Sequence, residues 1–123
     1  MLWLPSRGLS VSEARFEVRW TEEAVRDLEE IVGHIASDSP VNARGLLGRL
    51  RRRAEALDLT PLRGRVVPEL ARFVIRSWRE LLVKPYRIIY RVAEKEVYVL
   101  AVVDGRRELE DVLLERLVRS RER

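Results

Sequence analysis

The chain has 123 residues, a length that fits one domain able to bury a core without disulfides or metals. It contains no cysteine and a single histidine, which excludes a disulfide framework, a thiol nucleophile and a zinc cluster, so we expect no metal and no cofactor. The net charge of +4 is uneven, because residues 44–91 hold 13 basic and 4 acidic side chains. Positive charge is therefore concentrated in the middle third of the chain.

Residues 1–14 contain Pro5, Gly8 and three serines without a clear period. We interpret them as a flexible N-terminal extension, followed by a single domain over residues 15–123. The start lacks the basic flank and long apolar stretch of a secretory signal, and no apolar run approaches the roughly 20 residues that span a bilayer. We therefore expect a cytoplasmic protein without a membrane partner.

A first strand and two helices are predicted over the next segment. Apolar and charged residues alternate over 15–20, which predicts a strand with one buried face. Thr21 predicts the N-cap of a helix that runs to about Ser37, with an apolar stripe at spacings of four, three and four: Ala24, Leu28, Ile31 and Ile35. Ser39 and Pro40 predict the start of a second helix. Its expected buried stripe consists of Val41, Leu46, Leu47, Leu50, Ala54 and Leu57.

Gly45 and Gly48 lie inside this second helix, where each costs about 1 kcal/mol relative to alanine. We expect close packing of the helix against another backbone to be the reason that they are tolerated.

The second half of the chain has β character. Apolar residues over 73–83 predict a long or bent strand, and Lys84-Pro85 predicts a tight turn. Strict alternation over 86–92 places Tyr86, Ile88, Tyr90 and Val92 on one face of the next strand and Arg87, Ile89 and Arg91 on the other. Residues 97–103 are apolar almost throughout, which predicts a central strand. From Glu108, a last amphipathic helix is predicted.

The order β, α, α, β, β, β, α predicts an α+β fold, a small two-layer domain in which the helical hairpin packs on a mainly antiparallel sheet. The opposite face of the sheet stays partly open. We expect Arg79, Arg87 and Arg91 to converge on that open face, with Arg106 and Arg107 at the end of the sheet.

The chain resembles the RelE/ParE superfamily of type II toxin–antitoxin toxins over most of its length. The similarity lies in four segments in the right order and spacing: residues 18–28, 64–70, 79–92 and 104–107. The resemblance implies the RelE/ParE-like toxin fold and a growth-arresting protein that a cognate antitoxin neutralises. RelE-type members cut messenger RNA in the ribosomal A site, whereas ParE-type members poison DNA gyrase.

The residues favour the ParE-like branch. RNA cleavage by 2′-hydroxyl attack needs a base, an acid and positive charge at the phosphate. RelE-type enzymes supply these groups from lysines, arginines and an aromatic or histidine in the last helix. Here Arg87 and Arg107 match the arginines, but Trp78, Glu80 and Leu113 stand at the positions of the proton-transfer groups. Glu80 with Arg87 forms an alternative base only if the protein is an RNase.

Three hypotheses follow from the resemblance: a toxin that binds gyrase, a ribosome-dependent mRNA endoribonuclease, and a non-toxic basic interaction module of the same fold. Target contact is expected at Arg79, Arg87, Arg91, Arg106 and Arg107. Antitoxin contact is expected at Leu109, Leu113 and Leu117, because the last helix is more apolar than a narrow core stripe requires. We also expect an acidic, partly disordered antitoxin segment across the helical hairpin or the sheet edge, and assembly with the antitoxin or with a second copy.

Overall fold

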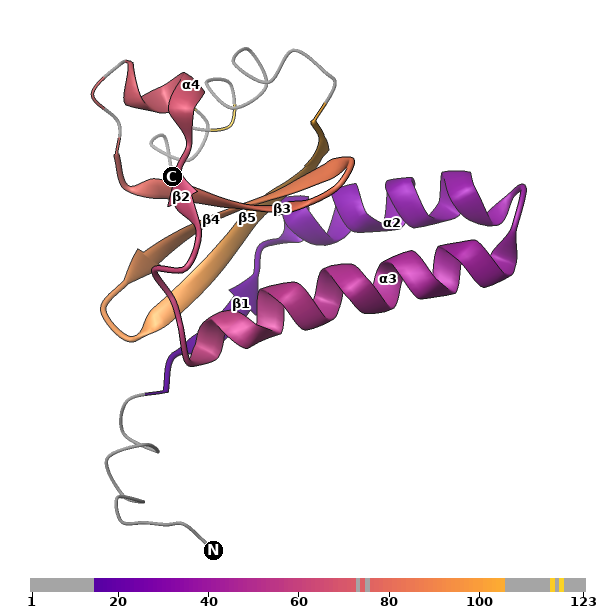
Figure 1. Ribbon diagram of the computed structural model, residues 1–123, viewed down its shortest axis with the longest axis horizontal. Coiled ribbons are helices and arrows are strands. Elements are labelled where there is room, and N and C mark those ends of the chain that lie inside the picture. Colours follow the sequence, from indigo (N-terminus) through magenta and orange to yellow (C-terminus); the bar gives the residue numbers. More distant parts are fainter. Residues whose placement is uncertain (1–14, 73, 75, 106–115, 117, 119–123) are drawn as a thin grey trace, which may run out of the picture.

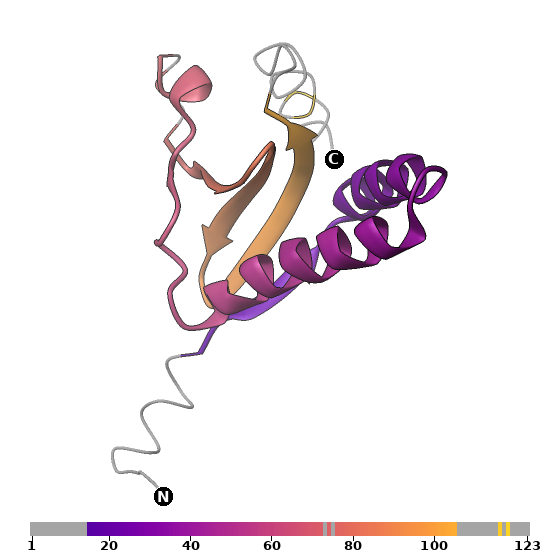
Figure 2. The ribbon, with the colours of Figure 1, turned by 45° about the vertical axis from the view of Figure 1, so that its right-hand side comes forward.

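The fold was examined in a computed structural model, which describes residues 15–72, 74, 76–105, 116 and 118. A helical hairpin lies on one face of a five-stranded sheet, and a short helix lies on the other side (Figures 1 and 2). The elements in chain order are β1 Glu17–Trp20, α2 Glu22–Ala36, α3 Pro40–Glu55, the 3-10 turn η1 Ala56–Asp58, β2 Arg65–Val66, α4 Pro68–Ala71, β3 Trp78–Val83, β4 Tyr86–Ala93 and β5 Glu96–Asp104.

The strand order in the sheet is β1-β5-β4-β3-β2. β2, β3, β4 and β5 pair antiparallel in succession, whereas β1 pairs parallel with β5. The predicted α+β fold with a mainly antiparallel sheet is therefore confirmed. β1 and β5 can pair in parallel because they are far apart in the sequence: the α2–α3 hairpin and strands β2 to β4 connect them.

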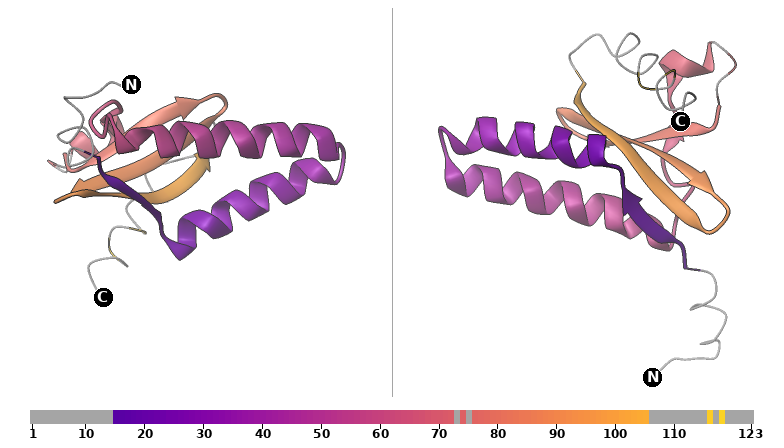
Figure 3. Two further views of the ribbon diagram at one scale, coloured as in Figure 1. Left: turned by 90° about the horizontal axis from the view of Figure 1, so that it is seen from below. Right: turned by 180° about the vertical axis from the view of Figure 1, so that it is seen from behind.

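The two long helices begin where their caps were predicted. The Thr21 side chain accepts a hydrogen bond from the backbone N–H of Ala24, and Ser39 accepts one from Asn42. The buried stripe of α3 is largely as predicted. The prediction that Val41 belongs to it is wrong, because 72% of the surface of Val41 is exposed. Figure 3 shows why: the two helices extend past the sheet at the end where they join, and Val41 lies in the first turn of α3 there.

The main core lies between the hairpin and the sheet. The alternation predicted for β4 is confirmed, since Ile88 and Tyr90 pack under the helices while Ile89 belongs to a second cluster on the other face. A register shift in β5, where Ile89 pairs with Ala101 and Tyr90 with Val99, changes which positions face the helices. Val97 and Val99 pack under the helices before the shift, and Val102 does so after it. None of the described helices has the length and apolar character needed to cross a bilayer.

Asp27 of α2 stabilises this irregular part of β5. Its carboxylate accepts a hydrogen bond of 3.0 Å from the backbone N–H of Val102 and also pairs with Arg116 at 2.8 Å. Arg116 and Val118 are helical, whereas the rest of the predicted last helix lies outside the described residues, as do residues 1–14. Asp27 thus links α2, β5 and the C-terminal segment.

The segment before β3 differs from the prediction. A long or bent strand was expected from residue 73, but β3 begins at Trp78, and β2 and α4 precede it. Pro68 starts α4, and the fully buried Val67 and Leu70 pack beside Trp78 and Ile89. Part of the face that was expected to be open is therefore covered.

Gly45 and Gly48 were expected to pack against another backbone, and this expectation is wrong. A Cβ atom at Gly45 would lie 3.9 Å from the Arg49 guanidinium, and one at Gly48 would lie 3.0 Å from that of Arg52. Both glycines therefore face arginine side chains of their own helix.

Candidate functional site

Arg87 is the most strongly engaged arginine of the open sheet face. It extends from β4, and its two terminal nitrogens bind the two carboxylate oxygens of Glu69 at 2.8 and 2.9 Å. Its Nε donates to Glu80 at 2.7 Å, and only 11% of its side chain is exposed. Burial acts to lower the pKa of Arg87, but the hydrogen bonds with Glu69 and Glu80 outweigh burial and raise that pKa. Arg87 is thus a permanently charged group held between two carboxylates.

Glu80 of β3 occupies the centre of this network. Its side chain has no exposed surface, and its second oxygen accepts a hydrogen bond of 2.6 Å from Nε of Arg65, the residue opposite it on β2. The network of Arg65, Glu69, Glu80 and Arg87 therefore joins α4 and three strands. A buried carboxylate with both oxygens bound to guanidinium groups has no free lone pair aimed at solvent. This geometry favours anchoring over proton transfer.

Arg79 lies on the other face of the sheet, so the expected convergence of the three arginines is wrong. Its neighbours at alternate positions of β3, Leu81 and Val83, belong to the core under the helices. Its guanidinium donates to the carbonyl of Gly64 at 2.7 Å. The alternation of β3 separates Arg79 from Arg87, and no register change between the two strands brings them together.

Gly64 is held tightly at this point. Its N–H donates to the hydroxyl of Tyr90 at 2.8 Å, and a Cβ atom would lie only 2.4 Å from the carbonyl oxygen of Glu80. Burial raises the pKa of Tyr90, so the hydroxyl stays protonated. The loop before β2 is therefore fixed by Arg79 and Tyr90 together.

Arg91 shares the face of Arg87 but lies about 13 Å further along β4, at 3.3 Å per residue. Its guanidinium stands over the ring of Tyr98, 5.7 Å from the centroid. The Tyr98 hydroxyl donates to Glu96, which also binds Arg19 of β1 at 2.7 Å. The hydrogen bond to Glu96 raises the pKa of Tyr98. Arg87 and Arg91 thus belong to two separate polar clusters.

The remaining residues predicted for target and antitoxin contact lie outside the described part of the chain: Arg106, Arg107, Leu109, Leu113 and Leu117. The position that precedes them is described. The N–H of Gly105 donates to the Pro85 carbonyl at 2.7 Å, and a Cβ at Gly105 would lie 3.3 Å from the Arg87 side chain. A shallow hollow of about 380 Å³ adjoins this point, and its cationic lining residues are Arg65, Lys84 and Arg87.

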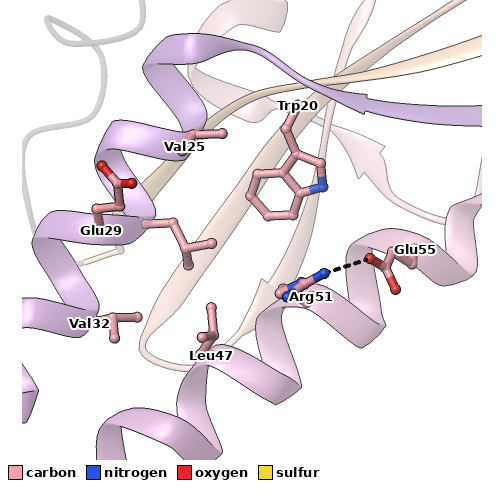
Figure 4. Close-up of a pocket in the computed structure, with 8 residues that line it drawn as sticks. Trp20, Val25, Glu29, Val32, Leu47, Arg51 and Glu55 are labelled. Atoms are coloured by element: carbon pink, nitrogen blue, oxygen red, sulfur yellow. Dashed lines mark ion pairs between the residues drawn. The ribbon is translucent and has the colours of Figure 1, made fainter.

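A larger groove of about 430 Å³ lies between α2 and α3. Its floor is apolar, its rim carries one ion pair between Arg51 and Glu55 at 3.7 Å, and the Trp20 ring points into the space between the helices (Figure 4). The lining residues are Trp20, Val25, Leu28, Glu29, Val32, Leu47, Arg51 and Glu55.

This lining was not predicted as a site from the sequence. The available signal was the width of the apolar arc of α2. Val25 and Val32 lie beside the predicted stripe, and Val25 keeps 39% of its surface exposed.

Comparisons with known proteins agree with this architecture. The family described as the ParE toxin of type II toxin-antitoxin systems, parDE, matches residues 18–109. A protein of Sinorhizobium fredii named as toxin Y4kP is 33% identical over 102 residues, which covers 81% of this chain and 99% of that protein. Toxin RelE2 of Caulobacter vibrioides is 33% identical over 86 residues, 70% of this chain and 91% of the relative.

Two solved structures share the fold. A chromosomal ParDE toxin–antitoxin system from P. aeruginosa superposes with a TM-score of 0.61 at 22% identity and covers 74% of this chain and 97% of that one. The RelBE2 toxin–antitoxin complex from Mycobacterium tuberculosis has a TM-score of 0.54 at 25% identity and covers 74% of this chain and 92% of that one. Both structures come from toxin–antitoxin systems.

Proposed function

The chain belongs to the ParE toxin family of RelE/ParE type II toxin–antitoxin systems, and from this premise we propose that it arrests growth by binding DNA gyrase. The observation that carries the proposal is the network around Arg87. An RNase of this superfamily would present Arg87 to RNA, but here Arg87 is bound by the carboxylates of Glu69 and Glu80. Glu80, the carboxylate that could act as a base, is buried. A protein arranged in this way acts by binding rather than by breaking a bond, and it acts in the cytoplasm, where gyrase works.

The test is a supercoiling assay with purified protein and DNA gyrase. We expect loss of supercoiling and, on induction in cells, a DNA damage response. Unchanged supercoiling together with no damage response would reject gyrase as the target.

A ribosome-dependent endoribonuclease is the second candidate. The hollow lined by Arg65, Lys84 and Arg87 favours it, because a cluster of cations is what a phosphate requires. Arg107 lies two positions after Gly105, which also lines the hollow. Messenger RNA that stays intact after incubation with programmed ribosomes would exclude this activity.

We further propose that the cognate antitoxin covers the groove between α2 and α3. An amphipathic segment could place its apolar side chains on the floor formed by Trp20, Leu28 and Leu47. An acidic residue of that segment would meet Arg51 on the rim, in place of Glu55. The antitoxin would fold as it binds, so that part of the interaction free energy is used to order it.

A further inference from the structure

The outer face of α3 carries a group of arginines that neither the groove nor the Arg87 network uses. Arg44, Arg49 and Arg52 are exposed residues of α3 that lie outside its buried stripe of Ala43, Leu46, Leu50 and Ala54. We call these three residues the outer arginine face. It belongs to α3, whose N-terminal end extends past the sheet (Figures 1 and 3).

These arginines differ in their partners from the ion-paired arginines of the chain. No carboxylate among the described residues lies within ion-pair distance of Arg44, Arg49 or Arg52. Several other arginines pair with carboxylates of the same chain: Arg15, Arg19, Arg51, Arg65, Arg87 and Arg116. The outer arginine face is thus uncompensated positive charge gathered on one helix.

The two glycines of α3 shape the same face. The guanidinium of Arg49 lies over Gly45 and that of Arg52 lies over Gly48, where a Cβ atom would be only 3.0 Å away. Both side chains therefore lie along the helix instead of standing away from it. The result is a smooth cylinder with a cationic surface, and Arg44 and Arg52 are separated by about 12 Å along its axis.

We infer that the outer arginine face of α3 binds the phosphate backbone of duplex DNA. Duplex DNA presents one negative charge per about 1.7 Å of axis, so three guanidinium groups over this length each reach a phosphate. The guanidinium fork matches two phosphate oxygens. The inference deepens the proposed function and rests on it, since gyrase holds duplex DNA, and α3 would contact that DNA beside the enzyme.

An acidic protein fits this face less well than DNA. Protein interfaces obtain most of their affinity from buried aromatic or aliphatic anchors. The only large apolar side chain exposed on α3 is Val41, whereas sequence-independent binding to DNA requires cations and little else. The unpaired arginines and the lack of exposed apolar anchor residues both favour duplex DNA, a regular polyanion, as the partner of the outer arginine face.

The test measures fluorescence anisotropy of a labelled random-sequence duplex titrated with the full chain at several salt concentrations, without gyrase. In the triple variant Arg44→Gln, Arg49→Gln, Arg52→Gln, we expect the slope of log K against log salt to become shallower by about 2.7, or 0.9 per lost contact. Affinity at 50 mM salt should fall at least tenfold. Circular dichroism checks that the variant is folded.

A matched control removes the same charge elsewhere: Arg26→Gln, Arg63→Gln, Arg76→Gln, three exposed arginines outside α3. It should keep at least half of the duplex affinity of the unmodified chain. Equal losses in the two triple variants would overturn the inference, because net charge and not α3 would then decide binding. So would failure of the unmodified chain to bind duplex at 50 mM salt. If the duplex is bound but supercoiling is unaffected by the protein, the gyrase proposal fails and the DNA contact stands.

Discussion

At the scale of single residues, the Arg87 network shows how one side chain changes role with its partners. In a free state, Arg87 would be a ready phosphate ligand. Here Glu69 and Glu80 hold it from two sides, and Arg65 binds the remaining oxygen of Glu80. Because every carboxylate oxygen of the network has a cationic donor, the group ties α4 to the sheet.

Replacing Glu80 by Gln should therefore destabilise the fold. The variant leaves the largely buried Arg87 with one carboxylate, at a Glu80 position that has no exposed surface, whereas Arg65, which is 60% exposed, can turn to water. We expect a loss of about 3 kcal/mol in the free energy of unfolding, measured by urea denaturation. Glu55→Gln is the control. Glu55 is 57% exposed and should cost under about 0.5 kcal/mol. Equal effects of the two changes would contradict an anchoring role.

Glu69 makes the network sensitive to acid. The hydrogen bonds from Arg87 hold the pKa of the Glu69 carboxyl below its ordinary value of 4.5. A depressed folded-state pKa means that the stabilisation is complete above about pH 4.5 and is lost as the pH falls through the folded-state value. Urea midpoints measured between pH 6 and pH 3 should therefore decline less steeply in Glu69→Gln than in the unmodified chain. Parallel curves would show that Glu69 does not contribute to the acid sensitivity.

At the scale of elements, two glycines in different settings have opposite requirements. Gly64 lies where the loop meets β3 and Tyr90, and no Cβ fits there. Gly45 lies on the surface of α3, where an added methyl group would meet only the end of the Arg49 side chain. The same residue type is required at one position and merely tolerated at the other.

The substitution of each glycine by alanine tests this difference. Gly64→Ala should lower the free energy of unfolding by about 3 kcal/mol, since the backbone of Glu80 cannot move without breaking the β2–β3 pairing. Gly45→Ala should raise it by up to about 1 kcal/mol through helix propensity. Thermal unfolding of the two variants beside the unmodified chain gives both values. Destabilisation by Gly45→Ala would mean that α3 needs the glycine.

At the scale of the whole molecule, two surfaces of the helical hairpin have different characters. The groove between α2 and α3 is apolar with a sparse polar rim, whereas the outer side of α3 is cationic. Arg44, Arg49 and Arg52 are not among the residues that line the groove, so we propose that an antitoxin in the groove and DNA on the outer face have separate binding determinants.

Val25→Asp should weaken binding of the antitoxin encoded beside this protein by at least tenfold, because it places a charge on the apolar lining of the groove. Val41→Asp is the matched control. It introduces the same charge at a valine that is 72% exposed and outside the groove, and it should change antitoxin affinity less than threefold. Isothermal titration calorimetry with purified partners measures both. If Val41→Asp weakens binding as much as Val25→Asp, the antitoxin does not lie in the groove.

Much of the fold follows from local patterns in the sequence. The caps at Thr21 and Ser39 and the alternation of Tyr86 to Val92 predict the helices and β4 without reference to distant residues, because capping and burial periodicity act within a few positions. The short β2 and α4 were missed, since a two-residue strand and a four-residue helix contain too few positions to show a period.

The arrangement of the candidate sites could be predicted from the sequence far less well than the helices and strands, because it depends on the tertiary structure. The sequence alone identified the family and the fold class. Only the folded chain decided that Glu69, 18 positions away, closes on Arg87, that Arg79 points to the opposite face, and that Trp20 and Leu47 line one groove. These relations join residues distant in the chain. Which side chains meet is set by strand order and by the packing of the hairpin on the sheet, and no local pattern encodes it.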